Sequence, residues 1–161
     1  MNESLSYRLM KPGEEEETFA MIDRGFNAYV RDDFTSEGVE EFYRAIRIMV
    51  FEHLTNHFMA VAEINSQIVG MIDVKENYHI SIFFVEPSYM GKGIGRGLLS
   101  YAIMLCQQNK PDFIEFEVHS SPWAVPVYKK LGFESTGPEQ ESRGIRYTRM
   151  IKTLKSDKPL T

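Results

Sequence analysis

The chain has 161 residues, 43% of them hydrophobic, and carries a formal net charge of −5. This length supports one buried core without disulfides, and the single cysteine, Cys106, excludes a disulfide within the chain. The acidic balance argues against nucleic acid as a partner, and the lack of a leader-like segment or of about 18 consecutive apolar residues predicts a cytoplasmic protein without membrane contact.

Residues 5–50 contain one strand pattern and two helix patterns. An opening strand at Leu5–Met10 ends at Lys11-Pro12-Gly13. The acidic run Glu14–Glu17 then begins a helix, where negative charge suits the helix dipole. A loop at Asp32–Thr35 separates this helix from a second one. Apolar residues recur at helical spacing in the two helices, at Phe19, Ile22, Phe26 and Tyr29/Val30, and at Val39, Phe42/Tyr43, Ile46 and Met49/Val50.

Strand patterns dominate the rest of the sequence. Two alternating strands, Phe58–Ile64 and Ile68–Val74, meet around Asn65-Ser66 as a hairpin. We expect a single domain over residues 1–155, followed by a frayed tail over 156–161. The remaining predicted elements are a strand at 79–85, a helix at about 93–108, a strand at 113–119, a short helix, and a closing strand pair at Glu134–Gly137 and Ile145–Ile151.

Three glycines at alternate positions, Gly91, Gly93 and Gly95, lie where a strand pattern gives way to a helical one. A glycine-rich turn that opens a helix presents backbone N–H groups without intrahelical acceptors, at the positive end of the helix dipole. Lys92 and Arg96 add positive charge beside these groups. The spacing matches neither the Walker loop nor the dinucleotide fingerprint. We therefore interpret the segment as a site for the pyrophosphate of a different ligand.

A second informative segment follows the strand at 113–119. Ser120 or Ser121 suits a helix N-cap, Pro122 fits the first helical turn, and Gly132 fits the C-terminal stop. Because Pro126 lies only four residues after Pro122, the segment predicts a helix that is short or begins late.

The stretches Val85–Leu99 and Tyr128–Phe133 together resemble the two main motifs of the GNAT family. These are the Gcn5-related N-acetyltransferases, which use acetyl-coenzyme A. The motifs lie in the family's order and about the family's distance apart. The resemblance covers nearly the whole chain and implies a mixed α/β (α+β) fold, with a largely antiparallel sheet of about seven strands flanked by about four helices.

The resemblance also implies a coenzyme A site around a V-shaped splay between the strands at 79–85 and 113–119. The pantetheine arm enters this gap and pairs with the backbone of Phe84 and Val85, since unpaired ladder groups can accept an amide-bearing arm. The other residues that the resemblance assigns to cofactor binding are Met90, Gly91, Lys92, Gly93, Ile94, Gly95, Arg96, His119 and Tyr128.

Amide formation requires a neutral amine and an acid for the leaving thiolate. Tyr128 occupies the family's general-acid position, where its hydroxyl faces the cofactor sulfur; the alternative is a core tyrosine. His79 falls where the histone-modifying branch has a glutamate base, and the ordinary pKa of histidine, about 6.5, suits a base near neutral pH. The alternative for His79 is a half-exposed strand residue. Rival bases are a water chain or the carboxylates of Glu63, Asp73 and Glu117.

Two residues depart from the family pattern. Met90 stands where the family usually has glutamine or arginine, and His119 stands where the second motif often has asparagine. Neither change removes the loop amides or the tyrosine hydroxyl, and histidine can still donate one hydrogen bond. Cys106 fits a buried core position rather than a catalytic thiol.

These residues predict an acetyl-coenzyme A-dependent N-acetyltransferase that moves an acetyl group to a primary amine by direct attack on the thioester. The alternatives are a non-catalytic acyl-coenzyme A-binding sensor or regulatory module, which has no use for the Tyr128 hydroxyl, and a protein-interaction domain without a cofactor. We expect no metal, expect a small-molecule or protein amine as acceptor, and leave a homodimer open. Aromatic and acidic residues that could form the wall of the acceptor site are Tyr29, Asp32, Asp33, Phe34, Tyr43 and Glu63. Such a wall suits a cationic amine; the alternative is an acidic surface that faces solvent.

Overall fold

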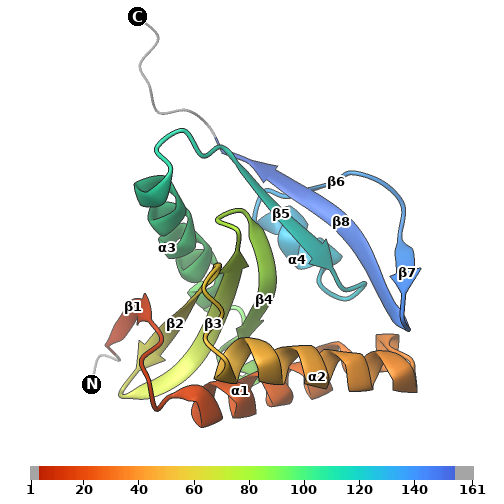
Figure 1. Ribbon diagram of the computed structural model, residues 1–161, viewed down its shortest axis with the longest axis horizontal. Coiled ribbons are helices and arrows are strands. Elements are labelled where there is room, and N and C mark those ends of the chain that lie inside the picture. Colours follow the sequence, from red (N-terminus) through yellow and green to blue (C-terminus); the bar gives the residue numbers. More distant parts are fainter. Residues whose placement is uncertain (1–3, 155–161) are drawn as a thin grey trace, which may run out of the picture.

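The computed structural model describes residues 4–154, which form eight strands and four α-helices (Figure 1). The tail predicted at 156–161 lies outside the described residues. The helices are α1 (Glu15–Tyr29), α2 (Ser36–Phe51), α3 (Ile94–Asn109) and α4 (Val125–Lys130). The strands are β1 (Leu5–Leu9), β2 (His57–Ile64), β3 (Gln67–Lys75), β4 (His79–Val85), β5 (Glu115–Ser120), β6 (Glu134–Ser135), β7 (Gln140–Ser142) and β8 (Ile145–Thr153).

The strands form one sheet in the order β1-β2-β3-β4-β5-β8-β6, and β7 pairs with β8. All strand pairs are antiparallel except the parallel pair of β4 and β5. The predicted mixed, largely antiparallel fold is therefore confirmed. The eighth strand is β7, whose sequence Gln-Glu-Ser is exposed and carries no apolar pattern that could predict it.

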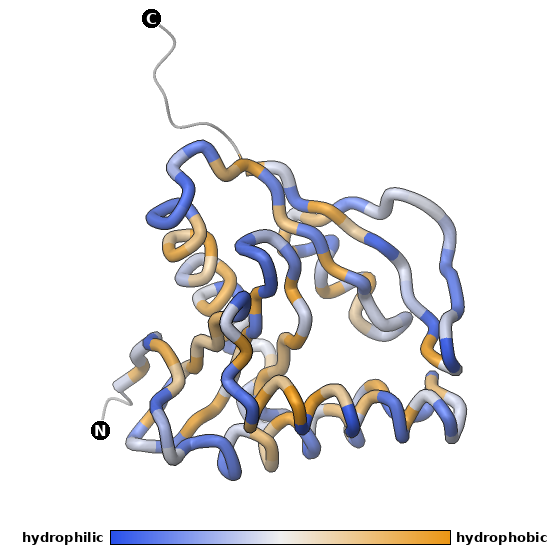
Figure 2. Tube along the Cα trace, in the orientation of Figure 1, coloured by the Kyte–Doolittle hydropathy of each residue, from blue (hydrophilic) through white to orange (hydrophobic). Residues whose placement is uncertain are grey.

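Two apolar clusters lie on opposite faces of the sheet. On one face, Met21 of α1 and Val50 of α2 pack with alternate strand residues such as Met71. On the other face, Leu98 of α3 packs in a cluster that includes Ile72. Successive strand residues point to opposite faces, so β3 serves both clusters. The hydropathy of α1 and α2 alternates between hydrophobic and hydrophilic along each helix, as one-sided burial requires (Figure 2). Among the described residues, no helix combines the length and apolarity needed to span a membrane.

The sheet opens between β4 and β5. These strands pair only at His79↔Glu117 and Ile80↔Val118, and they diverge beyond that point (Figure 1). The register of β3 against β4 shifts between Asp73 and Val74, which leaves Ser81 as an extra residue on β4. A bulge of this kind bends its strand and increases the local twist. The bulge therefore lies where β4 turns away from β5, and the predicted splay is present.

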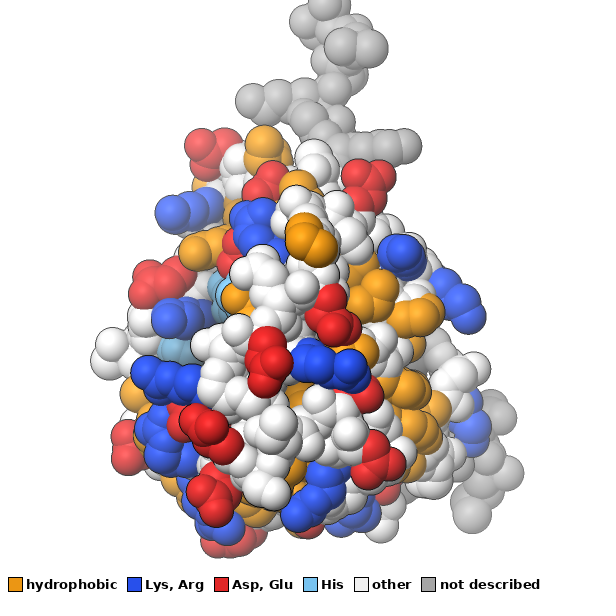
Figure 3. Space-filling model, turned by 90° about the vertical axis from the view of Figure 1, so that its right-hand side faces the viewer, with side chains coloured by type: hydrophobic (Ala, Val, Ile, Leu, Met, Phe, Trp, Pro, Cys, Tyr) orange, Lys and Arg blue, Asp and Glu red, His pale blue; other side chains and the backbone are white. Residues whose placement is uncertain are grey.

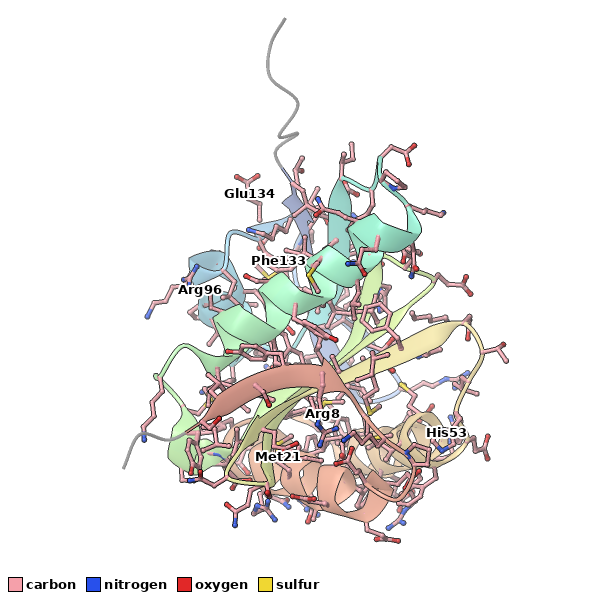
Figure 4. All side chains as sticks on the ribbon, turned by 90° about the vertical axis from the view of Figure 1, so that its left-hand side faces the viewer. Arg8, Met21, His53, Arg96, Phe133 and Glu134 are labelled. Carbon is pink, nitrogen blue, oxygen red and sulfur yellow. The ribbon has the colours of Figure 1, made fainter. Side chains whose placement is uncertain are left out.

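A partly buried network of ion pairs connects β1 and β2 to the start of α1. The Arg8 guanidinium donates to Glu14 Oε2 at 2.6 Å and, through Nε, to Glu63 Oε2 at 2.8 Å. The hydrogen bond from Arg8 lowers the pKa of Glu14 to about 2, although burial opposes this shift. Figure 4 shows Arg8 on β1, above α1. Glu63, one of the rival bases, is thus engaged on β2 with Arg8.

The Arg8 network predicts an acid-sensitive contribution to stability. Glu14 has a pKa of about 2 in the folded protein and an ordinary value of 4.5, so its contribution is present above the ordinary value and is lost as pH falls toward the folded one. Urea unfolding of Arg8→Met should show about 1–2 kcal/mol less stability at neutral pH and a shallower loss below about pH 5. The pair of Arg24, whose side chain is 53% exposed, with Glu86 provides a control that also loses one arginine, and Arg24→Met should keep the wild-type acid profile. Parallel profiles for Arg8→Met and the wild type would contradict this prediction.

Candidate active site

A cleft of about 1010 Å³ occupies the splay between β4 and β5. The loop before α3 and the helix α4 form one side of it, and the end of α1, part of α2 and the turn between β7 and β8 form the other. Ten of the twelve predicted site residues line this cleft or its floor: Phe84, Val85, Met90, Gly91, Gly93, Ile94, Gly95, Arg96, His119 and Tyr128. Lys92 and His79 lie outside that lining.

The glycine loop has the conformation that an anion cradle needs. Gly91 and Gly93 have φ angles of +78° and +83°, in the left-handed region that favours glycine. A Cβ at either position would meet no described atom within 4 Å, so the space beside the loop is open. The Gly97 N–H donates to the Gly93 carbonyl at 3.1 Å, which begins the helical ladder. The preceding amides of Ile94 and Gly95 therefore have no intrahelical acceptor and lie at the positive end of α3.

The two basic side chains of the loop have different positions. Arg96 lines the cleft and donates to the Lys130 carbonyl at 3.2 Å, next to α4 (Figure 4). The Lys92 ammonium lies over the Tyr89 ring, 5.0 Å from its centroid. Arg96 is thus the positive charge on the cleft side of the loop.

The edge of β4 that faces the cleft is open to a ligand. Phe84 and Val85 pair with Met71 and Gly70 of β3, and the described pairing with β5 ends at Ile80. Their backbone groups on the β5 side therefore have no strand partner among residues 4–154. A polar, extended chain can add to such an edge by main-chain hydrogen bonds.

Tyr128 lies in the wall of the cleft, on α4. Tyr128 is only 8% exposed, and its ring makes edge contacts with Phe83 and Phe133, at centroid distances of 6.2 and 5.2 Å. Burial raises the pKa of the Tyr128 hydroxyl well above its usual range. The hydroxyl therefore stays protonated at neutral pH and can donate a proton or a hydrogen bond into the cleft.

His119 and His79 lie on the sheet face that α2 covers. His119 lines the cleft, stacks on Tyr147 at a centroid distance of 4.7 Å, and lies 5.0 Å from the His79 ring. The His119 side chain is 45% exposed, and its partial burial and the neighbouring His79 both lower its pKa. His79 Nδ1 lies 2.8 Å from Glu117 Oε1, and Arg149 Nε donates to Glu117 Oε2 at 2.7 Å.

A second hollow, of about 440 Å³, adjoins the cleft beneath α2. His79 lines this hollow, and Ile80, Ser81 and His119 line both spaces. His57 also lines it and pairs through Nδ1 with Asp73 Oδ2 at 2.6 Å. Burial raises the pKa of Asp73, and hydrogen bonds from His57 and Ser81 only partly offset this. Asp73, another rival base, is therefore paired with His57, and His57 rather than Asp73 lines the hollow. His57 was not among the candidates predicted from the sequence.

The predicted acceptor wall is only partly present. Tyr29 and Phe34 line the cleft, and Tyr29 stacks on Trp123 across it, at a centroid distance of 4.5 Å. The other four candidates are absent from its lining: Asp32, Asp33, Tyr43 and Glu63. No local pattern indicates this role of Trp123, because its partner Tyr29 lies in a helix distant in sequence.

The turn between β7 and β8 closes the cleft against α2. Thr35 donates its N–H to the Gly144 carbonyl at 3.1 Å, and Phe34 forms a β-bridge with Ile145. A Cβ at Gly38 would lie 2.2 Å from the Gly144 carbonyl oxygen, so this close approach requires glycine. The face of the molecule that carries this turn mixes acidic and basic side chains, and histidine side chains are partly visible there (Figure 3).

Cys106 is a core residue. Its side chain is fully buried in the cluster around α3, and burial raises the pKa of its thiol to about 12. A thiol in this state does not supply a thiolate at neutral pH.

Comparison with known proteins identifies the family. A family model described as the acetyltransferase (GNAT) domain matches residues 30–154. YafP of Escherichia coli (strain K12), named an uncharacterized N-acetyltransferase, is 25% identical over 153 residues, which cover 94% of this chain and 97% of YafP. The chain therefore belongs to the GNAT acetyltransferase family, and the predicted enzyme class is confirmed.

Solved structures agree in fold. A GCN5-related N-acetyltransferase from Rhodopseudomonas palustris superposes with a TM-score of 0.79 at 22% identity, covering 96% of this chain and 99% of that one. The PaiA N-acetyltransferase from Thermoplasma acidophilum, solved in complex with coenzyme A, gives a TM-score of 0.74 at 17% identity, covering 94% of this chain and 99% of that one. At these identities the likeness supports the fold alone.

Proposed function

We propose that this protein is an acetyl-coenzyme A-dependent N-acetyltransferase that transfers the acetyl group to a primary amine, supplied by a small molecule or a protein. The observation that carries the proposal is the meeting of three features in one cleft: the amides before α3, the open edge of β4 at Phe84 and Val85, and the Tyr128 hydroxyl. The amides suit the pyrophosphate, and the strand edge suits the amide-bearing pantetheine arm. The complex of the Thermoplasma PaiA protein with coenzyme A supports the same ligand class.

The chemistry then follows from the two sides of the splay. The amine nitrogen attacks the thioester carbonyl carbon, the C–N bond forms, and the C–S bond breaks. The ammonium must first lose a proton to a base, and the departing thiolate gains one from an acid. Tyr128, kept protonated by burial, is the acid in this proposal.

The base is a histidine beside the splay. The sequence offers His79 as one candidate base, beside the strand carboxylates and a water chain, and His79 lies in the adjoining hollow with its Nδ1 on Glu117. The geometry favours His119, because its ring lines the cleft itself. Its lowered pKa keeps it neutral, and so able to accept a proton, at neutral pH. In this arrangement only His119 of the three lines the cleft, and the pair of His79 and Glu117 lies next to it, outside the lining of the cleft.

The first prediction concerns the loop amides. Gly93→Val forces a β-branched residue into the left-handed region and fills the space beside the amides, whereas Lys92→Ala removes a charge that lies over Tyr89. Calorimetric titration with acetyl-coenzyme A should show at least ~10-fold weaker binding for Gly93→Val and a change of about threefold or less for Lys92→Ala. Gly137→Val, at an uncrowded exposed glycine, controls for the added side chain. Equal affinities for the two loop variants would contradict the amide cradle.

The second prediction concerns Tyr128 and separates an enzyme from a sensor. Tyr128→Phe removes one hydroxyl and keeps the ring contacts with Phe83 and Phe133. If the hydroxyl protonates the thiolate, kcat should fall by about 10²–10⁴-fold while acetyl-coenzyme A affinity is retained. The measurement requires an acceptor found by screening amines with detection of released thiol. An unchanged kcat would make Tyr128 a core residue and leave only the binding function supported.

The third prediction distinguishes the two histidines by the pH profile of kcat/KM. If His119 is the base, His119→Gln should abolish the alkaline-rising limb and lower the rate by about 10²–10⁴-fold. Because the charge of His79 lowers the pKa of His119, His79→Gln should keep the limb and move it to higher pH. A limb that is lost in His79→Gln and kept in His119→Gln would return the base to His79.

A further inference from the structure

Three potential metal ligands meet beside the splay, on the face of the sheet that α2 covers. His79 of β4 is the register partner of Glu117 of β5, and His119 lies two residues further along β5, on the same face. Glu117 Oε1 lies 2.8 Å from His79 Nδ1 and 3.9 Å from His119 Nε2. One donor atom from each residue lies within 4.8 Å of the other two.

We propose that His79, Glu117 and His119 bind a divalent transition-metal ion of the Zn²⁺ class. Two imidazoles and one carboxylate are a ligand set that suits such ions and leaves a coordination position open. This inference goes beyond the transferase function, and the binding experiment below does not depend on it.

The distances are close to those that a bound ion imposes. Tetrahedral Zn²⁺ with bonds of about 2.0–2.1 Å holds its ligand atoms roughly 3.4 Å apart. The measured separations of 2.8 and 3.9 Å therefore need adjustments of about 0.5 Å each, and the pair of histidines needs at most about 1.4 Å. Rotation of side chains supplies such movements, while the paired strands hold the backbone in place.

The surroundings orient the ligands. Arg149 Nε donates to Glu117 Oε2 at 2.7 Å, which directs Oε1 toward the two histidines. Tyr147 stacks on the His119 ring at an interplanar angle of 25° and fixes its plane. Partners of this kind set ligand orientation in metal sites. The positive charge of Arg149 also repels a cation, so we expect micromolar rather than tighter affinity.

Open space adjoins the two histidines of the proposed site. His79 and His119 both line the hollow of about 440 Å³, which has room for water on the ion. An ion bound here would coordinate the imidazole of His119, which the proposed transferase reaction needs as a free base. On the proposed function, occupancy therefore inhibits acetyl transfer, and removal of the ion restores it.

The first experiment measures binding alone. Chelator-stripped full-length protein is titrated calorimetrically with ZnCl₂, and with CoCl₂ while the visible absorption of protein-bound Co²⁺ is followed. We expect a stoichiometry of one ion per chain and the visible absorption band of Co²⁺ with a low coordination number. Loss of an outer partner of a metal ligand costs about 10–100-fold in affinity, so His79→Ala, His119→Ala and Glu117→Gln should each cost at least that.

Two other histidines provide matched controls. His53 pairs with Glu15 at 3.1 Å, and its side chain is 56% exposed at the end of α2 (Figure 4). His57 lines the same hollow but pairs with Asp73. Neither His53→Ala nor His57→Ala should change Zn²⁺ affinity by more than about twofold. Circular dichroism of every variant checks that the fold is retained.

The outcomes separate the site from the transferase function. Absence of saturable binding at millimolar Zn²⁺, or equal loss in the His57→Ala or His53→Ala control, overturns the metal site and leaves the transferase proposal untouched. Binding that depends on the three ligands supports the site even if no acceptor amine is found. With an acceptor, Zn²⁺ should inhibit the wild type reversibly, and a chelator should restore full activity.

Discussion

The pairing of β4 with β5 stops after two residue pairs, and the candidate site depends on that stop. A parallel pair continued to Val85 would use the backbone groups of β4 and leave no edge for a ligand. The bulge at Ser81 supplies the physical cause, since an extra residue bends β4 at the point of divergence. Because β3 and β8 pair with the outer edges of these strands, the sheet stays continuous while its centre is open.

An open sheet centre requires that the two halves be held together elsewhere. The stack of Tyr29 on Trp123 and the contact of the Gly144 turn with the start of α2 provide this connection on the side of the cleft away from the glycine loop. The stack joins α1 to the segment before α4, and the turn joins β8 to α2. Both contacts line or border the cleft, so the residues that line this part of the cleft also hold the two halves of the fold together.

Local patterns were sufficient for the parts of this arrangement that depend on neighbouring residues. The glycine spacing predicts a turn that opens the helix at about 93–108, and in the structure Gly91 and Gly93 adopt positive φ angles at that place. The bulge at Ser81 and the pair of His57 with Asp73 could not be predicted, because each arises from register between strands far apart in sequence. For the same reason the sequence could not show that Glu63 would face Arg8 instead of an acceptor.

The pKa values of the proposed acid and the proposed base are shifted in opposite directions. Burial raises the pKa of the Tyr128 hydroxyl. The His119 side chain is 45% exposed, and its partial burial together with the charge of His79 lowers the pKa of its imidazole, so the charged form of each group is disfavoured. Tyr128 belongs to the cluster on the α3 face, and His119 lies on the face that α2 covers, so the splay separates them. At neutral pH the tyrosine therefore holds its proton and the histidine lacks its second one. These are the states in which an acid can serve the leaving sulfur and a base can serve the attacking amine, without a prior proton exchange with solvent.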